Sequence, residues 1–146
     1  MLSKIKKFIT LDFSKKRLLC EAYFFLAWGR ILKSVPFSRV APSLGYSFHE
    51  TPIQQVNNDK IVRDISYAVQ SMSRYTFWES ACLVQAIAAI RMLNRRKIKT
   101  TLYLGTTKDK NGKMIAHAWV RCGTIYVTGG DVKDHFTIVN SFANGE

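Results

Sequence analysis

The chain has 146 residues, enough for one domain with a substantial hydrophobic core. Apolar residues make up 47% of it and the formal net charge is +12, which excludes a globally disordered chain and favours acidic partners. The sequence contains no zinc-finger spacing, RNA-binding aromatic-glycine motif or basic heptad region, so nucleic acid is not an expected partner.

Three cysteines, Cys20, Cys82 and Cys122, are irregularly spaced and odd in number. This pattern argues against a disulfide framework and indicates a reducing, cytoplasmic compartment. The sequence has no Cys-x-x-Cys pair that would support a structural zinc site, and we expect neither a metal nor a cofactor. We expect Cys20 to lie in the core and Cys122 to be structural.

The first expected helix covers residues 15–33 and follows a basic leader at residues 1–16. Its apolar run, residues 18–32, is too short and too interrupted by Glu21 and Arg30 for a membrane-spanning helix. The small-residue cleavage site of a signal peptide is also missing after this run. We therefore expect a buried core helix; association with a membrane is an alternative that we do not favour.

Prolines and capping residues divide the next part of the chain. Pro36 and Pro42 should stop helices, so residues 34–52 are expected to be a connector with little regular structure. A second helix is expected at residues 57–72, with Asn58 as its cap. A third is expected at residues 80–94, with Ser80 as N-cap, and it is buried because it is apolar on nearly all sides.

After Lys99 the apolar pattern changes to the alternation of strands. We expect strands at residues 100–107, 114–122, 125–128 and 136–142, with turns at residues 109–112 and 123–124. Helices followed by an antiparallel sheet predict an α+β fold. We expect one domain over residues 1–146, with a helical N-terminal part at 1–56 and a second part at 57–146 that carries the candidate site.

A cysteine and a histidine carry the chemical hypothesis. Cys82 is expected near the second residue of its helix, where free backbone N–H groups and the helix dipole stabilise a thiolate and could hold an oxyanion. The alternative is a cysteine that only packs on a buried helix. His117 is expected on a strand face with Trp119, either as a general base or as a histidine of the core.

The hairpin suggests a third catalytic residue. A tight turn at Gly123-Thr124 places His117 opposite Gly130 and next to Asp131. Asp131 could then hold the distal imidazole nitrogen, with Asp134 as the second choice. The roles of Cys82, His117 and Asp131 would be nucleophile, general acid/base and orienting carboxylate. We expect the remaining histidines to be surface residues: His49 and His135.

These motifs together resemble the lasso-peptide leader peptidases, the transglutaminase-like half of the lasso B protein. The resemblance rests on Cys82-Leu83-Val84-Gln85-Ala86, the arginines that close that helix, Leu102-Tyr103-Leu104-Gly105 and Ala116-His117-Ala118-Trp119-Val120. It implies a papain-like, transglutaminase-like cysteine protease fold over the whole chain, with the catalytic core at residues 57–146. It also implies the catalytic residues Cys82, His117 and Asp131.

The resemblance further implies a reaction and its partners. A ribosomally made lasso precursor, destined for an antibiotic-type peptide, would be cut between leader and core before macrolactam cyclisation. Cys82 would attack the last leader carbonyl, His117 would protonate the departing core amine, and water would release the leader. The chain would act with a separate winged-helix precursor-recognition protein and an ATP-dependent lasso cyclase.

Two departures from the family pattern stand out. Arg121 takes a position that is often acidic in the family, and we expect little effect on the chemistry. A glutamine that completes a papain-type oxyanion hole is not evident upstream of Cys82, which leaves the Cys82 backbone N–H as the safest donor. Two other functions stay open: a transglutaminase-like acyltransferase or amidase with the same triad, and a non-catalytic basic module that binds a peptide or an anionic membrane.

Overall fold

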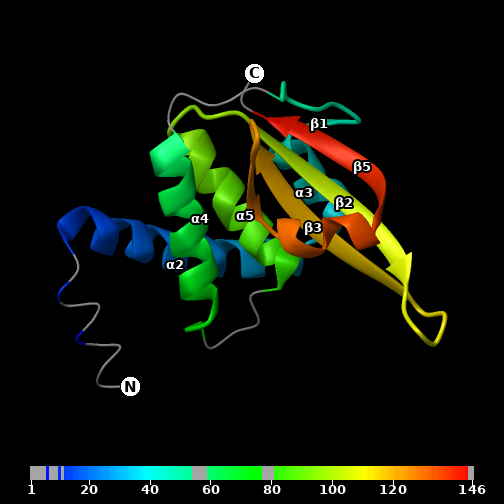
Figure 1. The fold of residues 1–146 in the computed structure, drawn as a ribbon, viewed down its shortest axis with the longest axis horizontal. Helices are drawn as coiled ribbons and strands as arrows, with labels where there is room; N and C mark the ends of the chain where they lie inside the picture. Colours follow the sequence, from blue (N-terminus) through cyan, green and yellow to red (C-terminus); the bar gives the residue numbers. More distant parts are fainter. Residues whose placement is uncertain (1–5, 7–9, 11, 54–58, 77–80, 145–146) are drawn as a thin grey trace.

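Apart from the short strand β1, the helices come first in the chain and the strands of an antiparallel sheet follow (Figure 1). A computed structural model of the protein describes Lys6, Thr10 and residues 12–53, 59–76 and 81–144. Within these residues the sheet has five strands in the order β1-β5-β2-β3-β4, all paired antiparallel. The elements are α2 (Phe13–Lys33), α3 (Phe37–Leu44), β1 (Tyr46–Ser47), α4 (Asp59–Ser73), α5 (Cys82–Arg95), β2 (Thr100–Lys108), β3 (Met114–Cys122), β4 (Ile125–Thr128), η1 (Gly130–His135) and β5 (Thr137–Asn144).

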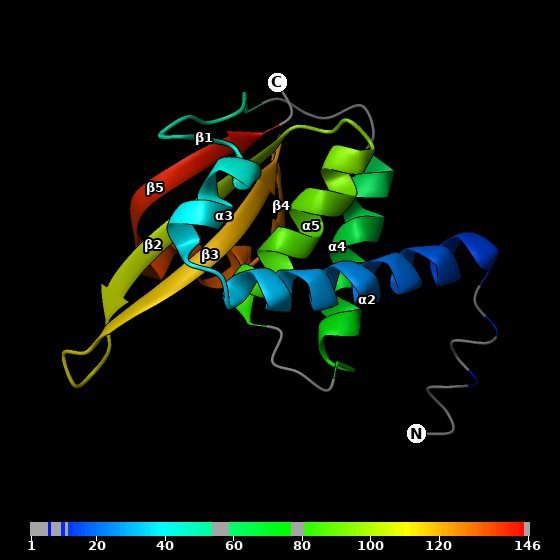
Figure 2. The same ribbon diagram turned by 180° about the vertical axis from the view of Figure 1, so that it is seen from behind.

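Helix α2 crosses the other two long helices and buries one face against them (Figure 2). It begins after Asp12, whose side chain accepts a hydrogen bond from the Lys15 backbone N–H at 3.1 Å. The expected core helix is confirmed on this face, but Cys20 lies on the outer side and is exposed, so its expected place in the core is wrong. No helix among the described residues is long and apolar enough to cross a membrane. The buried face consists of Leu18, Leu19, Ala22, Leu26 and Gly29.

The expected irregular connector at residues 34–52 is wrong, because it contains α3 and β1. Pro36 occupies the N-cap position of α3, where its missing N–H costs nothing. Pro42 lies inside the helix and removes one hydrogen bond, yet Val40 and Leu44 are buried in the core. Tertiary packing therefore outweighs the proline signal.

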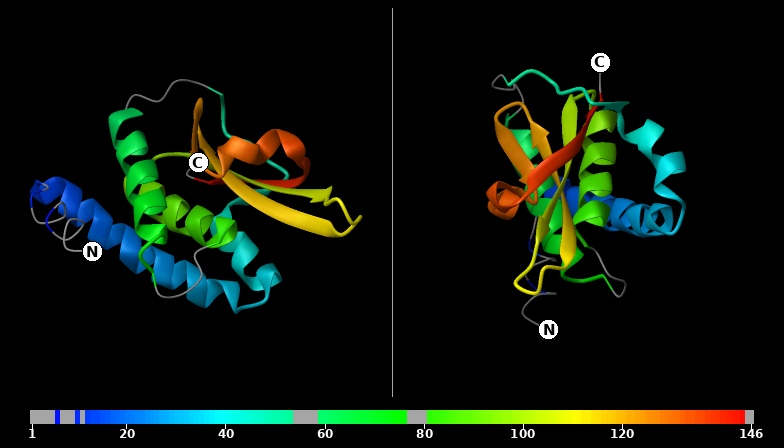
Figure 3. Two further views of the ribbon diagram at one scale, coloured as in Figure 1. Left: turned by 60° about the horizontal axis from the view of Figure 1, so that its bottom comes forward. Right: turned by 90° about the vertical axis from the view of Figure 1, so that its right-hand side faces the viewer.

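Helices α4 and α5 pack beside each other, and α5 lies between α2 and the sheet (Figure 3). The expected helices are present, although Asn57 and Asn58 lie outside the described residues. The N-cap of α5 is Ala81, whose side chain makes no capping hydrogen bond, so Cys82 is the first helical residue. Ser80, the expected N-cap, lies outside the described residues. The buried residues of α5 are Val84, Ala86, Ile87, Ala88, Ala89, Ile90, Met92 and Leu93.

The two faces of the sheet have different surroundings. Alternate residues of a strand point to opposite faces, so β3 contributes to both. Its core face packs with α5 and includes Ala118, Val120 and Cys122. The other face, which we call the outer face, carries His117, Trp119 and Arg121. Figures 1 and 2 show η1 on the outer side of the sheet and α3 on the core side.

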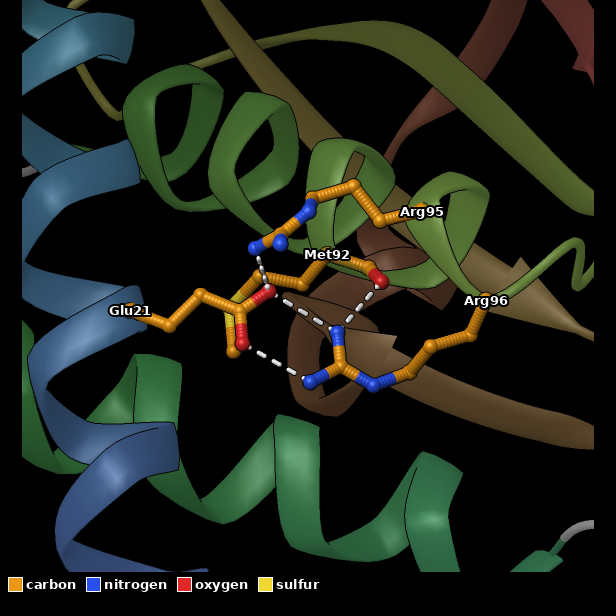
Figure 4. A network of polar contacts seen from close by, with 4 residues as sticks. All are labelled: Glu21, Met92, Arg95 and Arg96. Atoms are coloured by element: carbon orange, nitrogen blue, oxygen red, sulfur yellow. Dashed lines mark hydrogen bonds and ion pairs between the residues drawn. The ribbon is translucent and has the colours of Figure 1, made fainter.

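An ion-pair network ties α2 to the end of α5 (Figure 4). The Glu21 carboxylate accepts hydrogen bonds from Arg95 at 2.8 Å and from Arg96 at 2.8 and 2.7 Å, and its side chain is only 8% exposed. Burial by itself raises the pKa of Glu21, but the bonds and charges of Arg96 and Arg95 outweigh it and hold this pKa below its usual value of 4.5. The network therefore fixes how α5 lies across α2.

Replacing Glu21 by Gln should lower the free energy of unfolding by about 2 kcal/mol at pH 7, because the mostly buried Glu21 side chain no longer offers a carboxylate to the half-buried Arg96 and the exposed Arg95. A depressed pKa stabilises the fold above pH 4.5, and this contribution is lost as the pH falls through the folded-state value. Urea unfolding should therefore show a smaller difference in unfolding free energy between the wild-type protein and Glu21→Gln at about pH 3 than at pH 7.

The matched control for this variant is Asp64→Asn, which removes the exposed i,i+4 ion pair with Lys60 on α4. We expect it to cost less than about 0.5 kcal/mol at either pH. Equal effects of the two substitutions at pH 7 would contradict a special role for Glu21.

Candidate active site

A cleft of about 520 Å³ lies at the first turn of α5, beside the end of β4. It brings together Cys82, His117 and Asp131, the three residues predicted from the sequence. Asp134 instead is exposed and pairs with Lys133 at 3.0 Å. Both His49 and His135 are exposed, as expected. The cleft is lined by Gln70, Cys82, Gln85, His117, Tyr126, Thr128, Gly129, Gly130 and Asp131.

The thiol of Cys82 stands at the N-terminus of α5. The first intrahelical bond runs from the Gln85 N–H to the Ala81 carbonyl at 3.0 Å. The N–H groups of residues 82–84 therefore precede the regular ladder and have no acceptor within the helix. Cys82 is half-buried: it lines the cleft and also packs against the core, in which the rest of the helix is buried. This placement gives a thiol, and an oxyanion formed next to it, the positive end of the helix dipole.

The imidazole of His117 is held on several sides. Its Nε2 lies 2.8 Å from the Gly129 carbonyl oxygen. Its ring stacks on Trp119 at 5.7 Å and on Phe136 at 5.0 Å between centroids. Trp119 is 2% exposed, so it forms an apolar wall behind the histidine. The ring is thus fixed in plane and in position at the edge of the cleft.

The predicted pairing of His117 with Gly130 is wrong because the hairpin register changes. Residues next to the turn pair as expected, Arg121 with Tyr126, but Val120 then pairs with Thr128. This irregularity inserts an extra residue in β4, and the strand ends at Thr128. The chain then turns through Gly129 into η1, so on the β4 side His117 faces a bending backbone, while on its other side it pairs with Gly105 of β2.

Asp131 therefore reaches the cleft from η1 and not from a strand paired with His117, as the sequence predicted. It lies at the start of η1, is exposed, and contributes to the cleft lining. The hydrogen bond that the structure records for the His117 ring goes to Gly129. Asp131 adds a carboxylate to the same cleft as the imidazole, and Asp134, one turn further on, points to its own ion pair.

The other two cysteines stand in opposite environments. Cys122 is fully buried in the core, as expected, and burial raises the pKa of its thiol to about 11, although the charge of Arg121 works in the other direction. Cys20 is exposed on the outer side of α2. Among the three thiols, Cys82 is the one that lines the cleft.

Arg121 has a larger role than the sequence suggested. It is 2% exposed and donates hydrogen bonds to the Tyr103 hydroxyl at 3.0 Å and to the Thr51 and Gly123 carbonyls at 2.7 Å. Tyr103 in turn donates to the Glu50 carboxylate, and burial first, then this carboxylate, raises the pKa of its hydroxyl. The arginine thereby fastens residues 50–51 across the outer face.

This network reaches the histidine through aromatic contacts. Tyr103 stacks on its cross-strand partner Trp119 at 5.6 Å, and Trp119 stacks on His117. The shared strand face of His117, Trp119 and Arg121 was readable from their alternation. The partners of Arg121 come from a distant segment, and no local pattern indicates them.

Comparison with known proteins gives the family. A model of the transglutaminase-like superfamily matches residues 27–141, and the chain belongs to this superfamily. The match and the arrangement of helices and antiparallel sheet confirm the expected transglutaminase-like α+β fold. Proteins of this superfamily are usually cysteine peptidases or acyltransferases, which indicates an activity of this general kind. No curated protein and no solved structure was found to match the chain.

The three thiols should differ in their reaction with iodoacetamide at neutral pH. We expect Cys82 to be alkylated at least about tenfold faster than Cys20, because of the two only Cys82 lies at a helix N-terminus and lines the cleft that also contains the His117 imidazole. Cys122 should stay unreacted in the folded protein because it is buried. Peptide mass spectrometry after timed quenching measures all three rates, and unfolded protein serves as the control. Equal rates for Cys82 and Cys20 would favour a non-catalytic binding module.

Proposed function

We propose that this transglutaminase-like protein is a cysteine peptidase that removes the leader peptide from a ribosomally made lasso-peptide precursor. The observation that carries the proposal is the cleft shared by Cys82, His117 and Asp131. The superfamily supports cysteine-dependent acyl chemistry. The resemblance of the flanking motifs to the lasso leader peptidases supports the choice of substrate.

The proposed reaction begins with proton transfer. His117 takes the proton of the Cys82 thiol, and the sulfur attacks the carbonyl carbon of the last leader residue. The carbonyl oxygen becomes an oxyanion, which the backbone N–H groups at the start of α5 stabilise. When the C–N bond breaks, His117 gives its proton to the departing core amine, and the leader stays attached as a thioester.

Water completes the cycle. His117 removes a proton from the attacking water, the C–S bond breaks, and the proton returns to the Cys82 sulfur as the leader leaves with a free carboxyl group. Asp131 is the carboxylate of the proposed triad, and its negative charge favours the imidazolium that forms in both steps. These steps need no metal or cofactor.

Two amide side chains of the cleft could bind the backbone of the substrate peptide. Gln85 follows Cys82 by three residues on the same helix, so it brings an amide to the cleft on the same side as the thiol. Gln70 enters from α4, and its amide nitrogen is held by Ser66 at 2.9 Å and by the Val127 carbonyl at 3.0 Å. We propose that these amides contact the substrate backbone, with Gln85 as the side-chain donor nearest the oxyanion.

Partners belong to the same proposal. The lasso precursor would be presented by a separate winged-helix recognition protein in the cytoplasm, and an ATP-dependent cyclase would use the new core amine. The net charge of +12 favours an acidic surface on the precursor or on the recognition protein.

The alternative within the same superfamily is an acyltransferase or amidase. It would form the same thioester at Cys82 and differ only in the acceptor, an amine in place of water. An amide product that contains the added amine would identify it, whereas a leader with a free carboxyl group identifies the peptidase.

Replacing Cys82 by Ala should abolish cleavage, because no thioester can form, and replacing His117 by Ala should slow it by about 10³-fold or more. The assay is mass spectrometry of a candidate precursor incubated with the chain and its recognition partner. Cys20→Ala is the matched control, since it removes an exposed thiol outside the cleft, and it should cleave at the normal rate. Normal cleavage by Cys82→Ala would refute the proposal.

A further inference from the structure

We infer that the backbone carbonyl of Gly129 selects the tautomer of His117, and that Gly129 and Gly105 are positioning residues for the imidazole. The catalytic meaning of this arrangement rests on the proposed function. The arrangement itself concerns the resting protein and can be measured without a substrate.

The first part of the argument is the hydrogen bond at 2.8 Å between His117 Nε2 and the Gly129 carbonyl. A carbonyl oxygen can only accept, so Nε2 must carry the proton in the neutral ring. The lone pair is then on Nδ1, the one nitrogen that can take a proton from a thiol. A backbone carbonyl thus does what an orienting carboxylate does in a catalytic triad.

The second part is that only glycine can place this carbonyl. Gly129 has φ 68°, a backbone conformation that side chains disfavour. A Cβ atom there would lie 2.6 Å from the Ala118 carbonyl oxygen and 2.9 Å from His117 Nε2. The first of these atoms is backbone and cannot swing away. Any side chain at this position must therefore move the carbonyl, the imidazole or both.

The third part is the packing of two aromatic side chains against the ring. The centroids of Trp119 and Phe136 lie 6.5 Å from each other, so the two side chains are neighbours and do not enclose the imidazole from opposite faces. Trp119 and Phe136 stack on His117 with interplanar angles of 24° and 29°. Gly105 pairs with His117 across the strands and leaves room for both aromatic side chains. A Cβ at Gly105 would lie 2.8 Å from the Trp119 ring and 2.9 Å from Phe136 Cβ. Gly129, in the turn after β4, thus holds the imidazole through its carbonyl, and Gly105 on β2 makes room for the two aromatic side chains that pack against the ring.

This arrangement separates two tasks that a single aspartate usually performs. Gly129 orients the ring, and the Asp131 carboxylate is left to act through its charge in the cleft. The tautomer should therefore not depend on Asp131.

The test uses the full chain labelled with ¹⁵N and two readouts: the ring-nitrogen spectrum of His117 at pH 8, and the rate of Cys82 alkylation by iodoacetamide. The wild-type protein should show a protonated Nε2 and an unprotonated Nδ1. In Gly129→Ala we expect this single tautomer to be lost, and Cys82 alkylation to slow about tenfold as the imidazole moves off position. Asp131→Asn should keep the wild-type tautomer.

The matched control is Gly112→Ala. Gly112 has φ 77° but nothing lies within 4 Å of a Cβ built there, so this variant has the same backbone strain without contact with the site. It should keep the wild-type spectrum and alkylation rate. If Gly129→Ala does not fold, Gly105→Ala tests the aromatic packing against the ring, with a shifted His117 spectrum expected. The tautomer of the wild-type protein still tests the hydrogen bond.

Three results would overturn the inference: a protonated Nδ1 in the wild-type protein, a tautomer that changes in Asp131→Asn, or an unaltered spectrum and rate in folded Gly129→Ala. A protein that shows the expected tautomer but cleaves no precursor would instead leave the inference intact and contradict the proposed function.

Discussion

The burial of α5 is the constraint on which the site depends. This helix is apolar on nearly all sides and is enclosed by α2, α4 and the sheet, so its axis has little freedom. Glu21 holds the C-terminal end of α5 through Arg95 and Arg96. The buried, alanine-rich surface of α5 packs against its neighbours and holds the remainder of the helix. The N-terminus is consequently held at one place beside the end of β4. The nucleophile candidate Cys82 is rigid because of the core behind it.

The histidine is held by a different part of the fold. Its position depends on the outer face of the sheet, where Arg121 and Tyr103 join residues 50–51 to β2 and β3 and where Trp119 lies between Tyr103 and His117. The site is thus the meeting point of two rigid units, a buried helix and a braced hairpin. Substitutions in either unit can change the geometry of the cleft without touching it.

Local signals predicted much of this protein, and long-range contacts account for what they missed. The apolar stripe of α5 and the alternation of β2, β3 and β4 were sufficient to place Cys82 at a helix start and His117 on a strand. The helix at residues 37–44 was not expected, because the packing of Val40 and Leu44 overrides two proline signals. The extra residue in β4 and the partners of Arg121 depend on distant segments, so the register at His117 could not be derived from the turn alone.

The central claim is that Cys82 forms a thioester with a peptide and that water resolves it. Rapid acid quenching of a reaction between the chain, its recognition partner and a candidate precursor, followed by intact-protein and peptide mass spectrometry, measures this most directly. The account predicts a transient adduct of the leader acyl group on the peptide that contains Cys82, and a released leader that takes one ¹⁸O atom from labelled water. Precursor cleavage without an adduct on Cys82, or with the adduct on Cys20, would contradict it.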